Sequence, residues 1–151
     1  MASLKFISNT YLCYNIKMNQ TYKTGLLKWT NLFFLIPFIV SFYSGIYWYS
    51  FIILVAFIVS FDYHFFNEAK QVYYIDVLFS SSLIFSNFVL LFLGHWALPY
   101  SIVAVVFALT ALFFCYRKSK PDDYYFNHSL WHIFSAGICI SCLVTYISFI
   151  K

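Results

Sequence analysis

The sequence predicts an all-α fold, a polytopic transmembrane bundle of about five helices with a cytoplasmic N-terminus. Of its 151 residues, 63% are hydrophobic and only 9% are charged, whereas a soluble domain carries about 25% charged residues. The few charges are separated by three apolar runs of 33, 40 and 27 residues. The net charge of +4 comes from basic residues scattered between these runs. Together these features exclude a soluble globular domain, a disordered chain and a nucleic-acid-binding module.

The lengths of the apolar runs set the number of spans. One bilayer crossing needs about 20 apolar residues, so the first run, residues 29–61, predicts two helices with a turn near Ser44 and Gly45. The second run, residues 77–116, also predicts two helices, broken near Gly94-His95 and Pro99. The third run predicts one. The expected spans are 26–43, 46–66, 74–93, 97–115 and 127–149.

The N-terminal part of the chain contains two features that modify this pattern. Pro37 falls inside the first expected span, where we expect a kink that neighbouring helices can accommodate. Residues 1–24 mix lysine, asparagine and a few aromatic residues, without an apolar core long enough for a span or a signal peptide. We expect this segment to lie along the membrane surface. No repeat or linker divides the sequence, so residues 1–151 are expected to form a single transmembrane domain.

The basic residues predict the orientation of the bundle. With five spans, eight of the nine basic residues fall on the side of the N-terminus: Lys5, Lys17, Lys23, Lys28, Lys70, Arg117, Lys118 and Lys120. The other side carries only Lys151. Because cytoplasmic loops are enriched in lysine and arginine, this bias places the N-terminal side in the cytoplasm. We therefore expect an integral, multi-pass protein whose surroundings are membrane lipids.

Polar residues gather at the cytoplasmic ends of the expected spans. Ser60 and His64 are four residues apart at the end of the second span, and His128 and His132 have the same spacing at the start of the fifth. Residues four apart share one helix face. Asp76 opens the third span. The predicted topology brings these groups to one depth from three helices, and ionisable residues in a membrane are expensive and often functional.

These residue types match a catalytic zinc site. Three neutral imidazoles with an open fourth position are a ligand set of catalytic Zn²⁺, and His64, His128 and His132 fit it. Zinc lowers the pKa of a bound water towards 7. Asp76 fits the base that orients and deprotonates this water. Ser60 fits a donor to a developing oxyanion.

Other interpretations of these residues remain open. A Ser-His-Asp triad from Ser60, one histidine and Asp76 would leave two histidines without a role. A haem would make one member of the His128–His132 pair redundant. A structural zinc in a non-enzymatic membrane protein, active in sensing, transport or membrane remodelling, is the main alternative. His95 is expected to be an interfacial residue.

The cysteines do not add a second metal site to this prediction. Cys139 and Cys142 form one C-x-x-C within the last span, whereas a zinc ribbon needs two such pairs and a loop. We expect these two small side chains to pack between helices.

The spacing of the five polar positions resembles that of the CREST superfamily, which includes alkaline ceramidases, adiponectin and progestin receptors, GPI-remodelling lipid hydrolases and myomaker-type proteins. The match is S-x3-H at Ser60 and His64, an aspartate opening the next helix, and H-x3-H at the start of the last helix. "SFDYHFFNEAK" and "NHSLWHIFSAG" look most like the myomaker branch or a bacterial relative. The resemblance implies a zinc site near the cytoplasmic face and hydrolysis of a lipid amide or ester. Members usually have seven spans. Five spans are two fewer, so the helix ends that carry the ligands still lie on the same side of the membrane.

Overall fold

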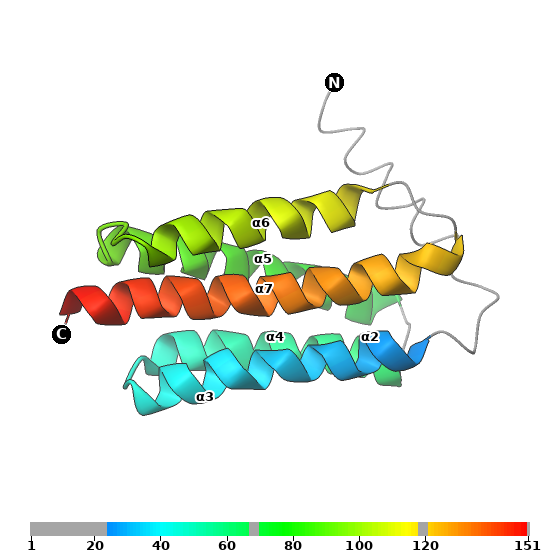
Figure 1. Ribbon diagram of the computed structural model, residues 1–151. Coiled ribbons are helices and arrows are strands. Elements are labelled where there is room, and N and C mark those ends of the chain that lie inside the picture. Colours follow the sequence, from blue (N-terminus) through cyan, green and yellow to red (C-terminus); the bar gives the residue numbers. More distant parts are fainter. Residues whose placement is uncertain (1–23, 67–69, 118–120, 151) are drawn as a thin grey trace, which may run out of the picture.

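The structure, a computed structural model, describes residues 24–66, 70–117 and 121–150. These residues are helical apart from short turns, and no strand occurs among them. Figure 1 shows the helices running alongside one another as a bundle. The predicted all-α helical bundle is confirmed. The expected surface segment, residues 1–24, lies outside the described residues except for Thr24.

The first helical segment changes its winding close to Pro37. It consists of α2 (Thr24–Thr30), the 3-10 turn η2 (Asn31–Phe34) and α3 (Leu35–Tyr43). Proline has no N–H for the carbonyl four residues earlier and its ring crowds that carbonyl. For Pro37 this is the carbonyl of Phe33, which lies within the 3-10 turn. Residues three apart eclipse in a 3-10 turn, and Asn31 and Phe34 are accordingly both buried.

The other helices are α4 (Tyr47–Phe65), α5 (Lys70–Leu93), α6 (Tyr100–Tyr116) and α7 (Pro121–Ile150). The turns between α3 and α4 and between α5 and α6 lie where they were predicted. In the first of them Gly45 has a φ of 78°, which glycine adopts without steric cost. Helices α5 and α7 begin before the expected spans 74–93 and 127–149, at residues 70 and 121. Polar residues extend both helices beyond their apolar stretches, and Pro121 suits the first helical position of α7.

Three of these helices are long and apolar enough to cross a membrane, by length and composition: Tyr47–Phe65, Lys70–Leu93 and Asp123–Ile150. Two further apolar helices, Asn31–Tyr43 and Tyr100–Tyr116, are shorter. Many large apolar side chains are exposed on the outside of the bundle, including Phe51, Phe85 and Leu109. An exposed apolar surface of this extent is typical of contact with lipid. The chain thus has the features of a membrane protein.

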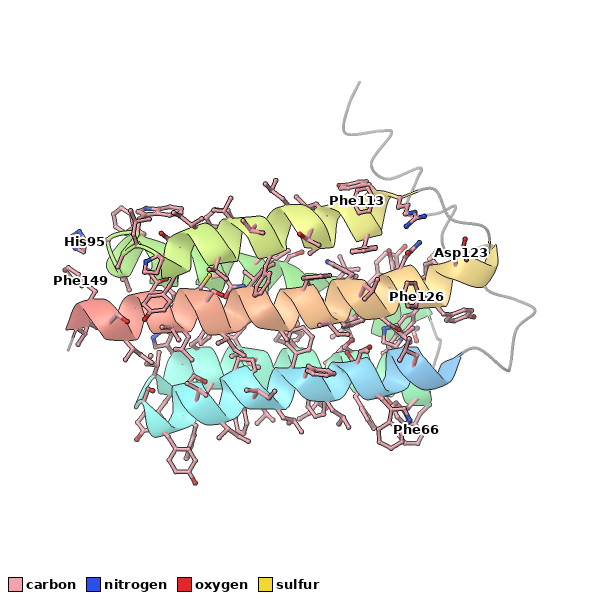
Figure 2. The ribbon with its side chains drawn as sticks, in the orientation of Figure 1. Phe66, His95, Phe113, Asp123, Phe126 and Phe149 are labelled. Carbon is pink, nitrogen blue, oxygen red and sulfur yellow. The ribbon has the colours of Figure 1, made fainter. Side chains whose placement is uncertain are left out.

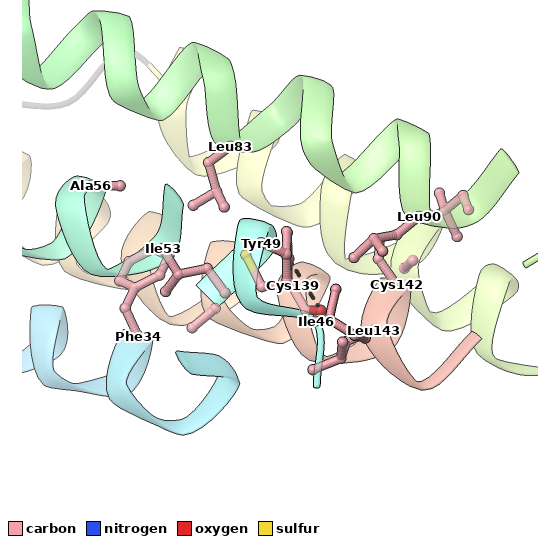
Figure 3. Packing of buried hydrophobic residues seen from close by; sticks show 13 residues of the cluster. Phe34, Ile46, Tyr49, Ile53, Ala56, Leu83, Leu90, Cys139, Cys142 and Leu143 are labelled. Atoms are coloured by element: carbon pink, nitrogen blue, oxygen red, sulfur yellow. Dashed lines mark hydrogen bonds between the residues drawn. The ribbon is translucent and has the colours of Figure 1, made fainter. Parts of the chain in front are cut away.

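Side chains, more than backbones, connect α4 with α7. Helix α4 packs against α5, α3 and the α2–η2 segment, and α7 packs against α6, α5 and the same first segment. In the core between them the Tyr49 hydroxyl donates to Asn87 Oδ1 at 2.5 Å, and Asn87 Nδ2 donates to Cys139 Sγ at 3.6 Å. Tyr49 and Cys139 lie side by side there, with the Tyr49 hydroxyl 3.4 Å from the Cys139 carbonyl oxygen (Figure 3). Cys139 and Cys142 are buried there, in agreement with their expected packing role.

Two glycines allow other helices to approach α7 closely, and we predict that they differ in their tolerance of alanine. A Cβ on Gly94 would lie 3.0 Å from the backbone of Thr145, whereas one on Gly137 would lie 2.7 Å from the ring of Phe107. Overpacking costs typically about 1–3 kcal/mol. Gly94→Ala should lower the thermal unfolding temperature in detergent, and Gly137→Ala should be rescued by Phe107→Leu because a ring can be replaced. An unchanged unfolding temperature in Gly94→Ala would contradict this packing.

Candidate metal centre

Three histidines meet at one end of the bundle. His64 lies one residue before the end of α4, and His128 and His132 lie two to three turns into α7. Phe66 and Phe126, which neighbour them in sequence, both lie at this end in Figure 2. Helices α4 and α7 enter this end in opposite directions, because α4 finishes where α7 starts (Figure 1). The structure therefore brings together the three histidines that the sequence predicted as ligands.

The geometry of the cluster suits one metal ion. Each histidine offers a ring nitrogen, and these nitrogens lie within 4.8 Å of one another. The ring centroids of His64 and His128 are 5.3 Å apart, those of His64 and His132 5.4 Å, and those of His128 and His132 4.8 Å. All three pairs of rings are inclined at 66–85°, so none of them is stacked face to face. This arrangement permits three lone pairs to converge on one point.

Burial and hydrogen bonding test whether a cation fits here. The side chains of His64 and His132 are each only 7% exposed, and the Nε2 atoms of both are buried. In the described part of the chain, Nε2 of His132 has no hydrogen-bond partner. Leaving a buried polar atom without a partner costs about 1–3 kcal/mol. A neutral imidazole lone pair that coordinates a metal accounts for such an atom, so the residues fit a cation.

Aromatic side chains surround the histidine rings. Tyr124 stacks on His128 at 5.4 Å and Trp131 packs edge-on against it at 5.0 Å. Phe34 of η2 packs edge-on against His132 at 6.0 Å. These contacts restrict the rotation of the imidazoles, and they shield the cluster with apolar surface. Restricting ligand rings in this way is how a surrounding shell prepares a metal site.

The two other predicted site residues lie at the same end. Ser60 is one turn before His64 on α4, and its hydroxyl donates to Asn31 Oδ1 at 3.3 Å. Asp76 lies in the second turn of α5, and one of its carboxylate oxygens is buried. α5 packs directly against α4. Asp76 was predicted near the start of the span 74–93, and it lies in the second turn because α5 begins at Lys70.

Asn31 is a polar residue of this region that the sequence prediction missed. It is fully buried in η2, and its Nδ2 atom has no hydrogen-bond partner in the described part of the chain. It has no polar residue four positions away in either direction, so an i, i+4 pattern does not mark it. An amide side chain inside an expected span is the signal that could have found it.

His95 is not part of the cluster. It lies in the turn after α5, where its ring packs on Phe149 at 4.3 Å. Figure 2 shows both residues at the end of the bundle opposite to Phe126 and Asp123. His95 is exposed, as expected of an interfacial residue.

Comparisons with known proteins place the chain in no established family. No protein-family model, curated protein or solved structure matches it significantly. A function for this chain must therefore come from its own residues and their geometry.

We predict that metal binding depends on all three clustered histidines and not on the fourth. His64→Ala, His128→Ala and His132→Ala should each weaken the affinity for Zn²⁺ by about 100-fold or more, because three ligands are reduced to two. Metal content can be measured by elemental analysis after purification and dialysis against a competing chelator. His95→Ala is the matched control and should keep the wild-type content. Equal loss in all four variants, or in none, would contradict a site at this cluster.

Proposed function

We propose that this chain is a zinc-dependent integral-membrane hydrolase that cleaves a lipid amide or ester. The observation that carries the proposal is the buried cluster of His64, His128 and His132, with ligand nitrogens within 4.8 Å. Zn²⁺ accepts three imidazoles in a tetrahedral site at about 2.0–2.1 Å and keeps one position open. The cluster differs from the four-cysteine sites typical of structural zinc. It also differs from the carboxylate-rich sites typical of calcium.

The residues around the cluster have complementary roles in this proposal. Zinc, when bound, supplies a Lewis acid that activates water and polarises a carbonyl. Asp76 accepts the proton of the attacking water and returns it to the leaving group, as a general base and then a general acid. Trp131, Tyr124 and Phe34 keep bulk water from the imidazoles. Ser60 supplies a polar group one turn from His64, on the same face of α4.

The surroundings of the site favour a lipid substrate. The histidines lie near one end of apolar helices rather than at their centre, which corresponds to the region where acyl chains join their headgroups. The amide and ester bonds of lipids lie at this depth. The exposed surface of the bundle is apolar, so a lipid can diffuse to the site within the bilayer. The resemblance to the CREST superfamily points to the same chemistry.

We further propose that the chain crosses the membrane five times, with the metal site near the cytoplasmic face. Lys70 and Arg117 lie at the histidine end of the bundle, at the start of α5 and directly after α6. The Lys70 ammonium lies 5.8 Å from the ring centre of Tyr74, and the Arg117 guanidinium 5.9 Å from that of Phe113. Basic side chains beside aromatic rings at helix ends are typical of a membrane interface. Their sign supports the cytoplasmic side.

Asp76→Asn separates metal binding from chemistry. Asparagine keeps the size of the side chain but loses the base, so the variant should retain its zinc and lose about 100-fold or more in turnover. Hydrolysis can be followed by mass spectrometry, with the zinc-loaded protein in detergent micelles that contain a mixture of lipid amides and esters. Asp123→Asn serves as the control because it removes an exposed carboxylate near the start of α7. If Asp76→Asn keeps every activity while the histidine variants only lower stability, a structural zinc in a non-enzymatic protein replaces this proposal.

The topology has its own test. A reporter fused to the N-terminus should report the cytoplasm, and a reporter fused after Lys151 should report the opposite side, because five passes separate the two ends. The side of each end can be measured in intact cells with two reporters, one active only in the cytoplasm and one active only on the opposite side of the membrane. A fusion in the segment 118–120 should match the N-terminal one. Two ends on the same side would mean an even number of passes and would overturn the proposed topology.

A further inference from the structure

Asn31 is linked to the histidine cluster through two helices. Its Oδ1 accepts the hydrogen bond of Ser60 at 3.3 Å, and Ser60 shares a helix face with His64 one turn further on. Three residues after Asn31, Phe34 packs against the ring of His132 at 6.0 Å. The η2 turn eclipses residues 31 and 34, so both belong to the face that packs against α4 and α7. Asn31 therefore lies beside the cluster although it is far from it in sequence.

The hydrogen bond of Ser60 decides which of the two side chains can still donate a hydrogen bond to a ligand. A serine hydroxyl has a single proton, and that of Ser60 is directed to Asn31 Oδ1. An asparagine amide has two N–H donors in addition to its oxygen. The Nδ2 atom of Asn31 is buried and has no partner within the described residues. The donor available in this pair is thus the amide of Asn31 rather than the hydroxyl of Ser60.

We propose that Asn31 Nδ2 donates a hydrogen bond to an oxygen atom, carbonyl or anionic, that binds beside the three histidines, and that Ser60 orients its amide. The inference rests on the proposed metal site and deepens it. Donors fixed before the reaction stabilise charge that develops on a substrate oxygen. The ligand class is a carboxylate, ester or amide group, since these present such an oxygen. Asn31 would contact this ligand directly, whereas Ser60 is a positioning residue.

A purely structural role does not account for Asn31. The bundle contains a second buried asparagine, Asn87, which uses both its groups: Oδ1 accepts from Tyr49, and Nδ2 donates to Cys139. Ser41 and Ser50 are likewise bonded to each other, at 2.7 Å. Buried polar side chains that only pack are normally satisfied in this way. Asn31 leaves its donor unused, which lowers stability unless a ligand takes it up.

Anion binding to the cobalt-loaded protein tests the proposal. Co²⁺ replaces Zn²⁺ at imidazole sites, and the visible absorption of the bound ion changes when acetate enters its coordination shell. Asn31→Leu keeps the volume and removes the donor, so it should weaken the acetate affinity by about 10-fold or more. Asn31→Asp keeps the acceptor for Ser60 and places an oxygen where the donor was, so it should weaken acetate at least as much. Both variants should keep the wild-type metal content.

Asn87→Leu is the matched control, and thermal unfolding without metal provides a second measurement. Asn87→Leu removes two formed hydrogen bonds, so it should lower the unfolding temperature by several degrees and leave the acetate affinity unchanged. Asn31→Leu removes the unsatisfied Nδ2 donor together with the acceptor of the Ser60 hydroxyl, so its unfolding temperature should fall by less than that of Asn87→Leu. This contrast distinguishes a binding residue from a structural one.

Each contrary outcome has one meaning. Wild-type acetate affinity in Asn31→Leu and Asn31→Asp would overturn the role of Asn31. A fall in the unfolding temperature of Asn31→Leu as large as that of Asn87→Leu, with unchanged acetate affinity, would assign Asn31 to the fold instead. If the wild-type protein binds cobalt and acetate but hydrolyses no lipid, the proposed function fails while the role of Asn31 stands. If it binds no metal at all, the proposed function and this inference both fall.

Discussion

The separation between α4 and α7 is the constraint on which the rest of the structure depends. Both helices pack on α5 and on the first helical segment, and large polar side chains cross the space that remains between them. Tyr49 reaches α7 at the middle of the bundle, where its hydroxyl lies 3.4 Å from the carbonyl oxygen of Cys139. His64 reaches His128 and His132 at one end. A metal held by these histidines would join two helices that share little direct backbone contact, so metal binding and bundle stability are expected to be coupled.

Much of the architecture could be predicted from the sequence because a bilayer imposes simple rules. Apolar run lengths and turn residues located the five helical segments and both turns. The two i, i+4 pairs, separated by the two helices expected at 74–93 and 97–115, were enough to place His64 at the same end of the bundle as His128 and His132. The helix starts at residues 70 and 121 were missed, since polar first turns continue a helix without adding an apolar signal.

Asn31 could not be predicted in the same way, because its role depends on tertiary contacts. Pro37 leads to the 3-10 turn, the turn aligns Asn31 with Phe34, and the packing of that face on α4 and α7 creates the hydrogen bond with Ser60. None of these steps follows from a periodic pattern. The sequence also predicted Ser60 as a donor, and in the structure its hydroxyl donates to Asn31 Oδ1.

The distribution of satisfied polar groups separates the scaffold from the site. In the middle of the bundle, Tyr49, Asn87 and Cys139 bond to one another. At the far end of the first segment, Ser41 and Ser50 do the same. The histidine end differs, because Asn31 Nδ2 and His132 Nε2 are buried there without hydrogen bonds in the described residues. Proteins tolerate such local costs where a ligand compensates for them. Asn31 Nδ2 is a hydrogen-bond donor and His132 Nε2 is an atom of the kind that binds metals, so this end of the bundle is suited to hold a cation and an oxygen atom together. The proposed zinc-dependent hydrolysis would use this pairing.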